Sequence, residues 1–327
     1  MNLRLAVFDL ARARQLTPEA RQRLLQLARV GTEPEELSSR LAVGVAVLAA
    51  ALCGLGIVMW IAANWNDFGR LGRFALLQGA VVAMGVGAWW RSAARPALGL
   101  LTLLGIGALF AYFGQTYQSG ADPWQLFALW AALGLPLALG VRSDVVWTPW
   151  ALVAMTGVSL WIRAHAAHSW WDHGGLDTTP VYLVGWALSI AMVLALGPAL
   201  RHKTGAGVWA MRTSVTLSVV AITFSALIGL FGPRVDPSYG LALLVMGGAG
   251  WVLSRPGHFD IFALSAIVLG LDTLLVGGLG RLVLHTIRFT GAGVLLLIGL
   301  AAAAQVAVSV QWVMRTARAH AVARSQS

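Results

Sequence analysis

Long apolar segments follow one another along most of the chain, and they constrain its fold more than any other feature. A transmembrane helix needs about 20 consecutive, mainly apolar residues. Spans are expected at residues 41–63, 73–90, 97–114, 124–140, 145–162, 180–198, 213–232, 239–254, 259–279 and 289–312. In a bilayer, backbone polar groups must pair within the protein, which favours helices. The sequence therefore predicts an all-α fold, a polytopic transmembrane helical bundle of about ten spans.

The composition excludes an ordinary soluble domain. Only 11% of the 327 residues are charged, against roughly 25% in typical soluble proteins. The formal net charge of +10 could suggest nucleic-acid binding. However, the basic residues lie between the apolar segments, where membrane topology accounts for them. The expected partner is therefore the lipid bilayer, and no nucleic acid is expected.

The distribution of basic residues predicts the orientation of the spans. With the N-terminus in the cytoplasm, the outer loops contain only part of the 23 Lys and Arg residues, namely Arg70, Arg73, Arg163, Arg234, Arg281 and Arg288. All the others fall on the inner side, as the positive-inside rule requires. This bias favours an even number of spans and two cytoplasmic termini.

Three regions are predicted on this basis. Residues 1–40 form a cytoplasmic amphipathic helical segment, residues 41–314 the transmembrane bundle, and residues 315–327 a basic cytoplasmic tail. Within the first region, Thr17 followed by Pro18 is typical of a helix start, with Thr17 as the N-cap. Glu35 and Glu36 are expected to begin a second helix that runs into the membrane.

Small and aromatic residues fit a tightly packed bundle in a bilayer. Small residues let transmembrane helices approach closely, and contact stripes are expected at Gly54, Gly56, Gly85, Gly87, Gly105, Gly107, Gly247, Gly248 and Gly250. Tryptophan is enriched at membrane interfaces, and this role is predicted for Trp60, Trp65, Trp89, Trp90, Trp124, Trp147, Trp170, Trp171 and Trp312.

Two polar segments lie at predicted outer span ends and are candidate ligand-binding sites. The candidate residues are Asn64, Trp65 and Asp67 after the first span, and Gln115, Tyr117, Gln118 and Asp122 between the third and fourth. Polar groups at half-buried helix ends often line transporter cavities. The alternatives are simple end-capping for the first segment and a structural re-entrant turn for the second.

Asp272 lies within the ninth apolar segment and is a candidate for proton coupling. An ionisable residue at membrane depth is costly and is a functional hypothesis by default. The alternative is that this span is shifted, so that Asp272 lies near an interface or pairs with Arg281 or Arg288.

No catalytic residue, metal site or cofactor is predicted. His165, His168, Asp172 and His173 are close in sequence, but their loose spacing is more typical of a solvated loop than of a metal site. The single cysteine, Cys53, can form no intrachain disulfide. We find no established catalytic motif, so an enzyme is not the expected class.

Three segments resemble a known family. The stretch from Leu10 to Ala20, containing Thr17-Pro18-Glu19, is similar to its cytoplasmic prelude, and Ala62–Asn66 and Gly114–Gly120 resemble its two hallmark segments. The family is that of bacterial predicted membrane proteins grouped as domain of unknown function 2157. The resemblance covers roughly residues 1–160, and Arg70, Arg73 and the histidine-containing loop depart from it. It implies a multi-span inner-membrane protein without an established activity.

Two function classes follow from these observations. The first is a transporter or flippase-like protein for a small or amphipathic solute, with ten spans dividing into two five-span halves. The alternative is a non-catalytic membrane subunit or sensor of an envelope complex, with the Arg-rich N-terminal segment as its docking element. An intramembrane transferase ranks lowest because no acid–base or metal set supports it.

Overall fold

The computed structural model describes residues 13–27, 35–64, 67–117, 120, 122–167, 178–232, 234–286 and 292–325. Within these ranges the chain consists of helices and turns and contains no strand. The helices are α2 (Pro18–Leu27), α3 (Glu35–Ala63), α4 (Arg70–Trp90), the 3-10 turn η1 (Ser92–Ala94), α5 (Arg95–Tyr117), α6 (Pro123–Val141), α7 (Asp144–Ala167), α8 (Thr179–Leu196), α9 (Arg201–Thr204), α10 (Val208–Phe231), α11 (Pro237–Leu253), α12 (Ile261–Thr286) and α13 (Ala292–Ser325). The all-α prediction is confirmed.

The helix lengths fit a membrane-spanning bundle. In the described part of the chain, nine helices are long and apolar enough to cross a membrane, and α11 is a shorter apolar helix. With 17 residues and a rise of 1.5 Å per residue, α11 is ~25 Å long. The predicted span at residues 259–279, which contains Asp272, corresponds to α12, a continuous helix of 26 residues. The polytopic helical bundle is confirmed, with the shorter helix α11 at the eighth predicted span, residues 239–254.

Met1–Leu52 and Cys53–Ser327 form two compact units. In the first unit, α2 begins at Pro18, and the Thr17 hydroxyl accepts a hydrogen bond from the Ala20 N–H at 3.4 Å. The predicted N-cap is therefore confirmed. α3 begins at Glu35, so a helix leads directly into the first apolar segment, as expected.

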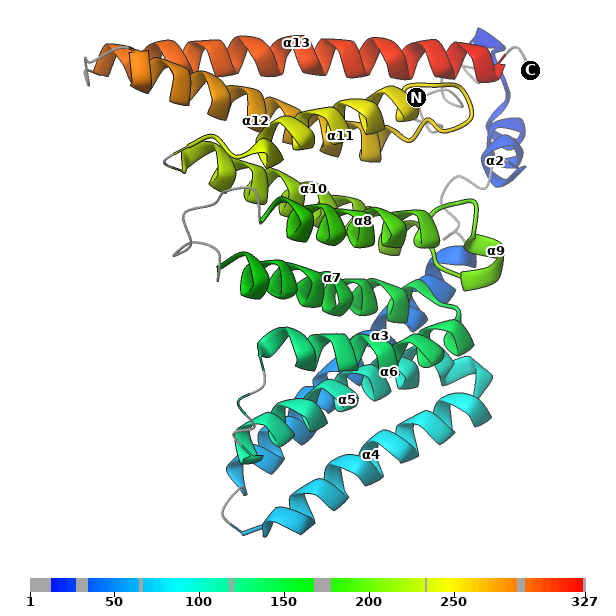
Figure 1. Ribbon diagram of the computed structural model, residues 1–327. Helices are drawn as coiled ribbons and strands as arrows, with labels where there is room; N and C mark the ends of the chain where they lie inside the picture. The colour runs from blue at the N-terminus through cyan, green and yellow to red at the C-terminus, as the bar shows by residue number, and fades with distance from the viewer. Residues whose placement is uncertain are drawn as a thin grey trace. The chain divides into compact units, whose positions relative to one another are not determined.

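In the second unit, consecutive long helices from α4 to α13 run in alternating directions (Figure 1). α5 packs against α4, α6 and α7, whereas α10 packs against α7, α8, α11 and α12. α12 packs against α10, α11 and α13, and α13 forms its main contact with α12. The α4–α5, α6–α7, α8–α10 and α11–α12 connections lie at one end, and the α5–α6 and α10–α11 connections lie at the other (Figure 1).

Close helix contacts occur at some of the predicted glycine stripes. A Cβ on Gly107 would lie 2.2 Å from the Trp130 ring, whose Nε1 donates to the Leu103 carbonyl at 2.8 Å. Gly107 therefore permits the α5–α6 contact. By contrast, a Cβ on Gly247 or Gly248 would meet nothing within 4 Å, so the structure does not support a contact stripe there.

Candidate functional site

Asp272 is held between α12 and α13. Its side chain is 5% exposed, and its Oδ1 accepts hydrogen bonds from Ser309 Oγ at 2.7 Å and Gln305 Nε2 at 3.2 Å. Gln305 and Ser309 are one helical turn apart on α13, so both side chains reach the same partner. No donor from the described residues bonds to Oδ2, the second carboxylate oxygen.

Asp272 lies near the middle of its helix. It follows Ile261 by 11 residues and precedes Thr286 by 14, which corresponds to ~16 Å and ~21 Å along the axis. Asp272 therefore lies away from both ends of α12. Arg281 Nη1 donates to the Gly232 carbonyl at 2.9 Å, and Asp272 bonds to α13 instead. Arg288, the other partner considered from the sequence, is outside the described residues.

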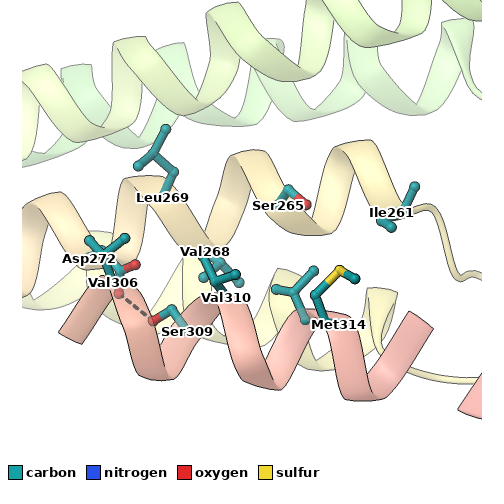
Figure 2. A pocket seen from close by; sticks show the side chains of 10 residues that line it. Ile261, Ser265, Val268, Leu269, Asp272, Val306, Ser309, Val310 and Met314 are labelled. Carbon is teal, nitrogen blue, oxygen red and sulfur yellow. Dashed lines mark hydrogen bonds between the residues drawn. The ribbon is translucent and has the colours of Figure 1, made fainter. Parts of the chain in front are cut away.

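A cavity of about 300 Å³ extends from Asp272 along the seam between α12 and α13 (Figure 2). Its polar lining is Asp272, Ser265 and Ser309. Its remaining lining is aliphatic or thioether, with Ile261, Val268 and Leu269 from α12 and Val306, Val310, Val313 and Met314 from α13. Ser265 has no hydrogen-bond partner in the described part of the chain. The result is an apolar groove with a carboxylate at one end.

The opposite face of α12 is fixed against α10 and α11. Leu274 is fully buried, and its carbonyl accepts a hydrogen bond from Tyr239 Oη on α11 at 2.9 Å. A Cβ on Gly270 would lie 2.4 Å from Met246 Cε and 2.8 Å from Val219 Cγ1. These contacts hold one side of α12 against α10 and α11. The groove lies on the other side of α12, where α13 packs.

The outer polar segments are placed at the same end of the second unit (Figure 1). The Asn64 side-chain amide donates to the Trp60 carbonyl at 2.9 Å, within its own helix end. Asp67 is exposed, and Trp65 is outside the described residues. The contact of Asn64 matches the end-capping alternative.

The second segment is divided between an aromatic cluster and exposed polar groups. The Tyr117 ring lies 4.8 Å from Phe113 and 6.0 Å from Phe74 on α4. Gln115 and Asp122 are exposed, and the Asp122 side chain makes no capping hydrogen bond. Gln118 is outside the described residues.

The structure does not bring these outer residues together with Asp272. Gln115 and Tyr117 belong to α5, which packs against α4, α6 and α7. Asp272 belongs to α12, which packs against α10, α11 and α13. A single polar cavity joining Asn64, Gln115 and Asp272 is therefore not present among the described residues.

His165 is the only residue of the histidine-containing loop that falls within the described ranges. Its Nδ1 lies 2.8 Å from the Trp161 carbonyl oxygen, and its ring lies 5.8 Å from that of Trp124. His168, Asp172 and His173 are outside the described residues. The residues that the structure describes contain no group of three or more His, Cys, Asp or Glu side chains that could hold a metal ion.

Asp144 has a structural role that the sequence reasoning missed. Its carboxylate accepts hydrogen bonds from the backbone N–H groups of Gly207, Trp209 and Ala210 at 2.8, 2.8 and 3.0 Å. These groups open α10, whose own N-cap, Gly207, has no side chain. Asp144, at the start of α7, thus caps a helix more than sixty residues away in sequence.

Trp147 differs from its predicted role as an interface anchor. It is 2% exposed, and its Nε1 donates to the Thr204 carbonyl at 2.9 Å. Trp89 and Trp90 are 82% and 86% exposed, as expected at a membrane interface. Trp147 instead fixes the α8–α10 connection to α7.

A comparison with protein families supports a membrane protein for the N-terminal part of the chain. The family model described as predicted membrane protein (DUF2157) matches residues 9–147. No curated protein and no solved structure matches the chain. Residues 9–147 cover α2 to α6 and the start of α7, whereas Asp272 and the groove lie beyond the matched region. Residues 9–147 thus match the model of the DUF2157 predicted membrane proteins, the family that the Thr-Pro-Glu, Asn-Trp-Asn and Gln-Thr-Tyr-Gln segments resemble.

Proposed function

We propose that this protein is a transporter or flippase-like protein that moves an amphipathic solute, taking it up in the groove between α12 and α13. The observation that carries the proposal is Asp272. It is a buried carboxylate near the middle of its helix, with one oxygen bonded to α13 and no donor on the other from the described residues. Binding sites of transporters commonly lie near the bilayer midplane. An apolar groove ending in such a group suits a solute with a polar head and an apolar body.

Proton coupling at Asp272 follows from the same geometry. Because Oδ1 already accepts two hydrogen bonds, a proton would bind at Oδ2, which is also the oxygen open to a solute. The titratable groups on the elements packed against α12 do not occupy that oxygen. Tyr239 of α11 donates to a backbone carbonyl, Arg281 bonds to Gly232, and Arg212 of α10 lies over the Phe262 ring. Proton and solute would then exclude each other at one atom.

The outer polar residues remain candidates for a peripheral contact site. We propose that Asn64, Trp65, Asp67, Gln115, Tyr117, Gln118 and Asp122 contact solute at the outer membrane surface. The two segments share one end of the second unit, which supports this assignment. The binding step itself is assigned to Asp272.

The orientation and regions expected from the sequence belong to this proposal. Residues 1–40 would lie in the cytoplasm, residues 41–314 in the inner membrane, and residues 315–327 in the cytoplasm as the basic tail. Support comes from the ends of the helices. The α4–α5, α6–α7, α8–α10 and α11–α12 connections lie at one end of the second unit (Figure 1). By the helix bounds, these connections and their edges contain Arg91, Arg142, Arg201, Lys203 and Arg255.

Transport is tested in liposomes that contain the purified protein, with a pH gradient imposed across the membrane. A panel of fluorescent amphiphiles differing in head-group charge is screened for uptake. The proposal predicts uptake of at least one amphiphile, its loss in Asp272→Asn, and its retention in Thr273→Val. Thr273 is a matched control because its hydroxyl bonds only to Leu269 of its own helix. Absence of uptake for the whole panel would contradict the proposal.

A second candidate function has separate support. Met1–Leu52 form a compact unit of their own, and the region contains several arginines. Such a unit suits a docking element of a membrane subunit or sensor. Deletion of residues 1–38 tests this role. Loss of a co-purifying membrane partner together with full retention of solute uptake would favour the subunit function for this region.

A further inference from the structure

The groove between α12 and α13 combines a single charge with extended apolar walls. We infer that its ligand class is a protonated straight-chain aliphatic amine, with the ammonium group on Asp272 and the hydrocarbon chain along the seam. The inference rests on the proposed function, since it names the chemistry of the solute that the groove would accept. It follows from charge, hydrogen-bond capacity and shape, taken in turn.

Charge selects a cationic head group. Among the described residues, Asp272 is the only charged one that lines the cavity, and its two hydrogen-bond partners, Gln305 and Ser309, are neutral. Charges interact strongly where water is excluded. A carboxylate or phosphate head would be repelled by Asp272, and a neutral alcohol would gain only a hydrogen bond.

Hydrogen-bond capacity selects an ammonium with N–H groups over a quaternary one. Oδ2 of Asp272 has no donor among the described residues. Ser309 Oγ uses its hydrogen to bond Oδ1, so its lone pairs remain able to accept. An ammonium group could therefore donate to Oδ2 of Asp272 and to Oγ of Ser309. A trimethylammonium group has the charge but no donor, and it is also wider.

Shape selects a straight chain. The lining residues from Ile261 to Asp272 extend over 11 residues of one helix, which is ~16 Å. Val268 and Asp272 lie beside Val306 and Val310 of α13, whereas Ile261 and Leu269 point away from α13 (Figure 2). A cavity of about 300 Å³ with this length is narrow, so a branched or ring-containing body would not fit as well as an alkyl chain.

The test measures equilibrium binding of four eight-carbon probes to the protein in lipid nanodiscs, with empty nanodiscs as the partition blank. The probes are octylamine, octyltrimethylammonium, octanol and octanoate. Octylamine is expected to bind at least about tenfold more tightly than each of the others, as a charge-assisted hydrogen bond would produce. Asp272→Asn should reduce octylamine binding to the level of octanol, and Thr273→Val should leave it unchanged.

A second variant keeps the test informative if Asp272→Asn fails to fold. Met314→Trp fills the groove one helical turn further from Ser309 than Val310, and it should abolish octylamine binding while Asp272 is intact. Octanol or octyltrimethylammonium binding as tightly as octylamine would overturn the inference and leave the proposed function standing. Binding of no probe above empty nanodiscs, together with no uptake in liposomes, would overturn the proposed function itself.

Discussion

Ser309 on α13 donates a hydrogen bond of 2.7 Å to Oδ1 of Asp272 on α12. The same oxygen accepts a bond from Gln305. Within the described residues, α12 is the main packing partner of α13. The hydrogen bonds from Ser309 and Gln305 fasten α13 to α12, and they leave Oδ2 of Asp272 facing the groove. The two roles make different demands, and substitutions can separate them.

Replacement of Ser309 by alanine should weaken the association of α12 with α13. Hydrogen bonds between transmembrane helices contribute about 0.5–1.5 kcal/mol, so a loss of that order in unfolding free energy is expected. Thermal unfolding in detergent measures it. Thr273→Val is the matched control, because that hydroxyl bonds within its own helix. Equal stability of the two variants would show that the Ser309 contact does not fasten the helices.

Replacement of Asp144 should destabilise the start of α10. Alanine removes an acceptor for three backbone N–H groups, and a loss of about 1–3 kcal/mol is expected. Asparagine should cost less, since its oxygen can still accept from Gly207 and Ala210. Hydrogen exchange at the amides of residues 207–210 provides the measurement. Unchanged protection in Asp144→Ala would contradict the assigned role.

Replacement of Gly107 by alanine should disturb the α5–α6 contact. The added Cβ would lie 2.2 Å from the Trp130 ring, and such overpacking costs about 1–3 kcal/mol. Gly247→Ala is the control, because its Cβ would meet nothing within 4 Å. Its expected effect is neutral or slightly stabilising, since alanine favours helix more than glycine does. Trp130 fluorescence and thermal unfolding together report the outcome, and similar losses in both variants would contradict this packing.

The orientation of the bundle can be measured with single cysteines. Cys53 is the only cysteine, so a Cys53→Ala background accepts new ones. Ser92→Cys and Ser254→Cys, in turns at one end of the bundle, should react only with reagents that reach the cytoplasm. Asp67→Cys and Arg234→Cys should react from outside the cell. The reverse labelling pattern would show that the termini are not cytoplasmic.

The fold could be predicted largely from sequence because the hydropathy of each local segment identifies a membrane span. The Thr17 cap and the helix that restarts at Glu35 were equally local signals. Asp272 could also be singled out from the sequence, since an ionisable residue in an apolar segment is unusual. Its partners were not singled out, because Gln305 and Ser309 are separated from it by more than thirty residues. The four-residue spacing of Gln305 and Ser309 in an apolar helix was the sequence signal that could have identified them.

The contacts of Asp144 and Trp147 show the other limit of prediction. Both residues follow a turn between two spans, where capping of their own helix and interface anchoring are the usual roles. Their actual partners lie at residues 204–210, and only the approach of that connection in space defines them. The two outer polar segments lie at the same end of the second unit, but among the described residues they share no cavity with Asp272.

The most direct test of the central claim is photolabelling of the groove. An eight-carbon alkylamine with a terminal diazirine is irradiated with the protein in nanodiscs, and the labelled peptides are identified by mass spectrometry. The account predicts saturable labelling of α12 and α13 around Val268, Val310 and Met314, which is abolished by Asp272→Asn and preserved in Thr273→Val. Labelling that is spread over other helices, or that persists unchanged in Asp272→Asn, would contradict it.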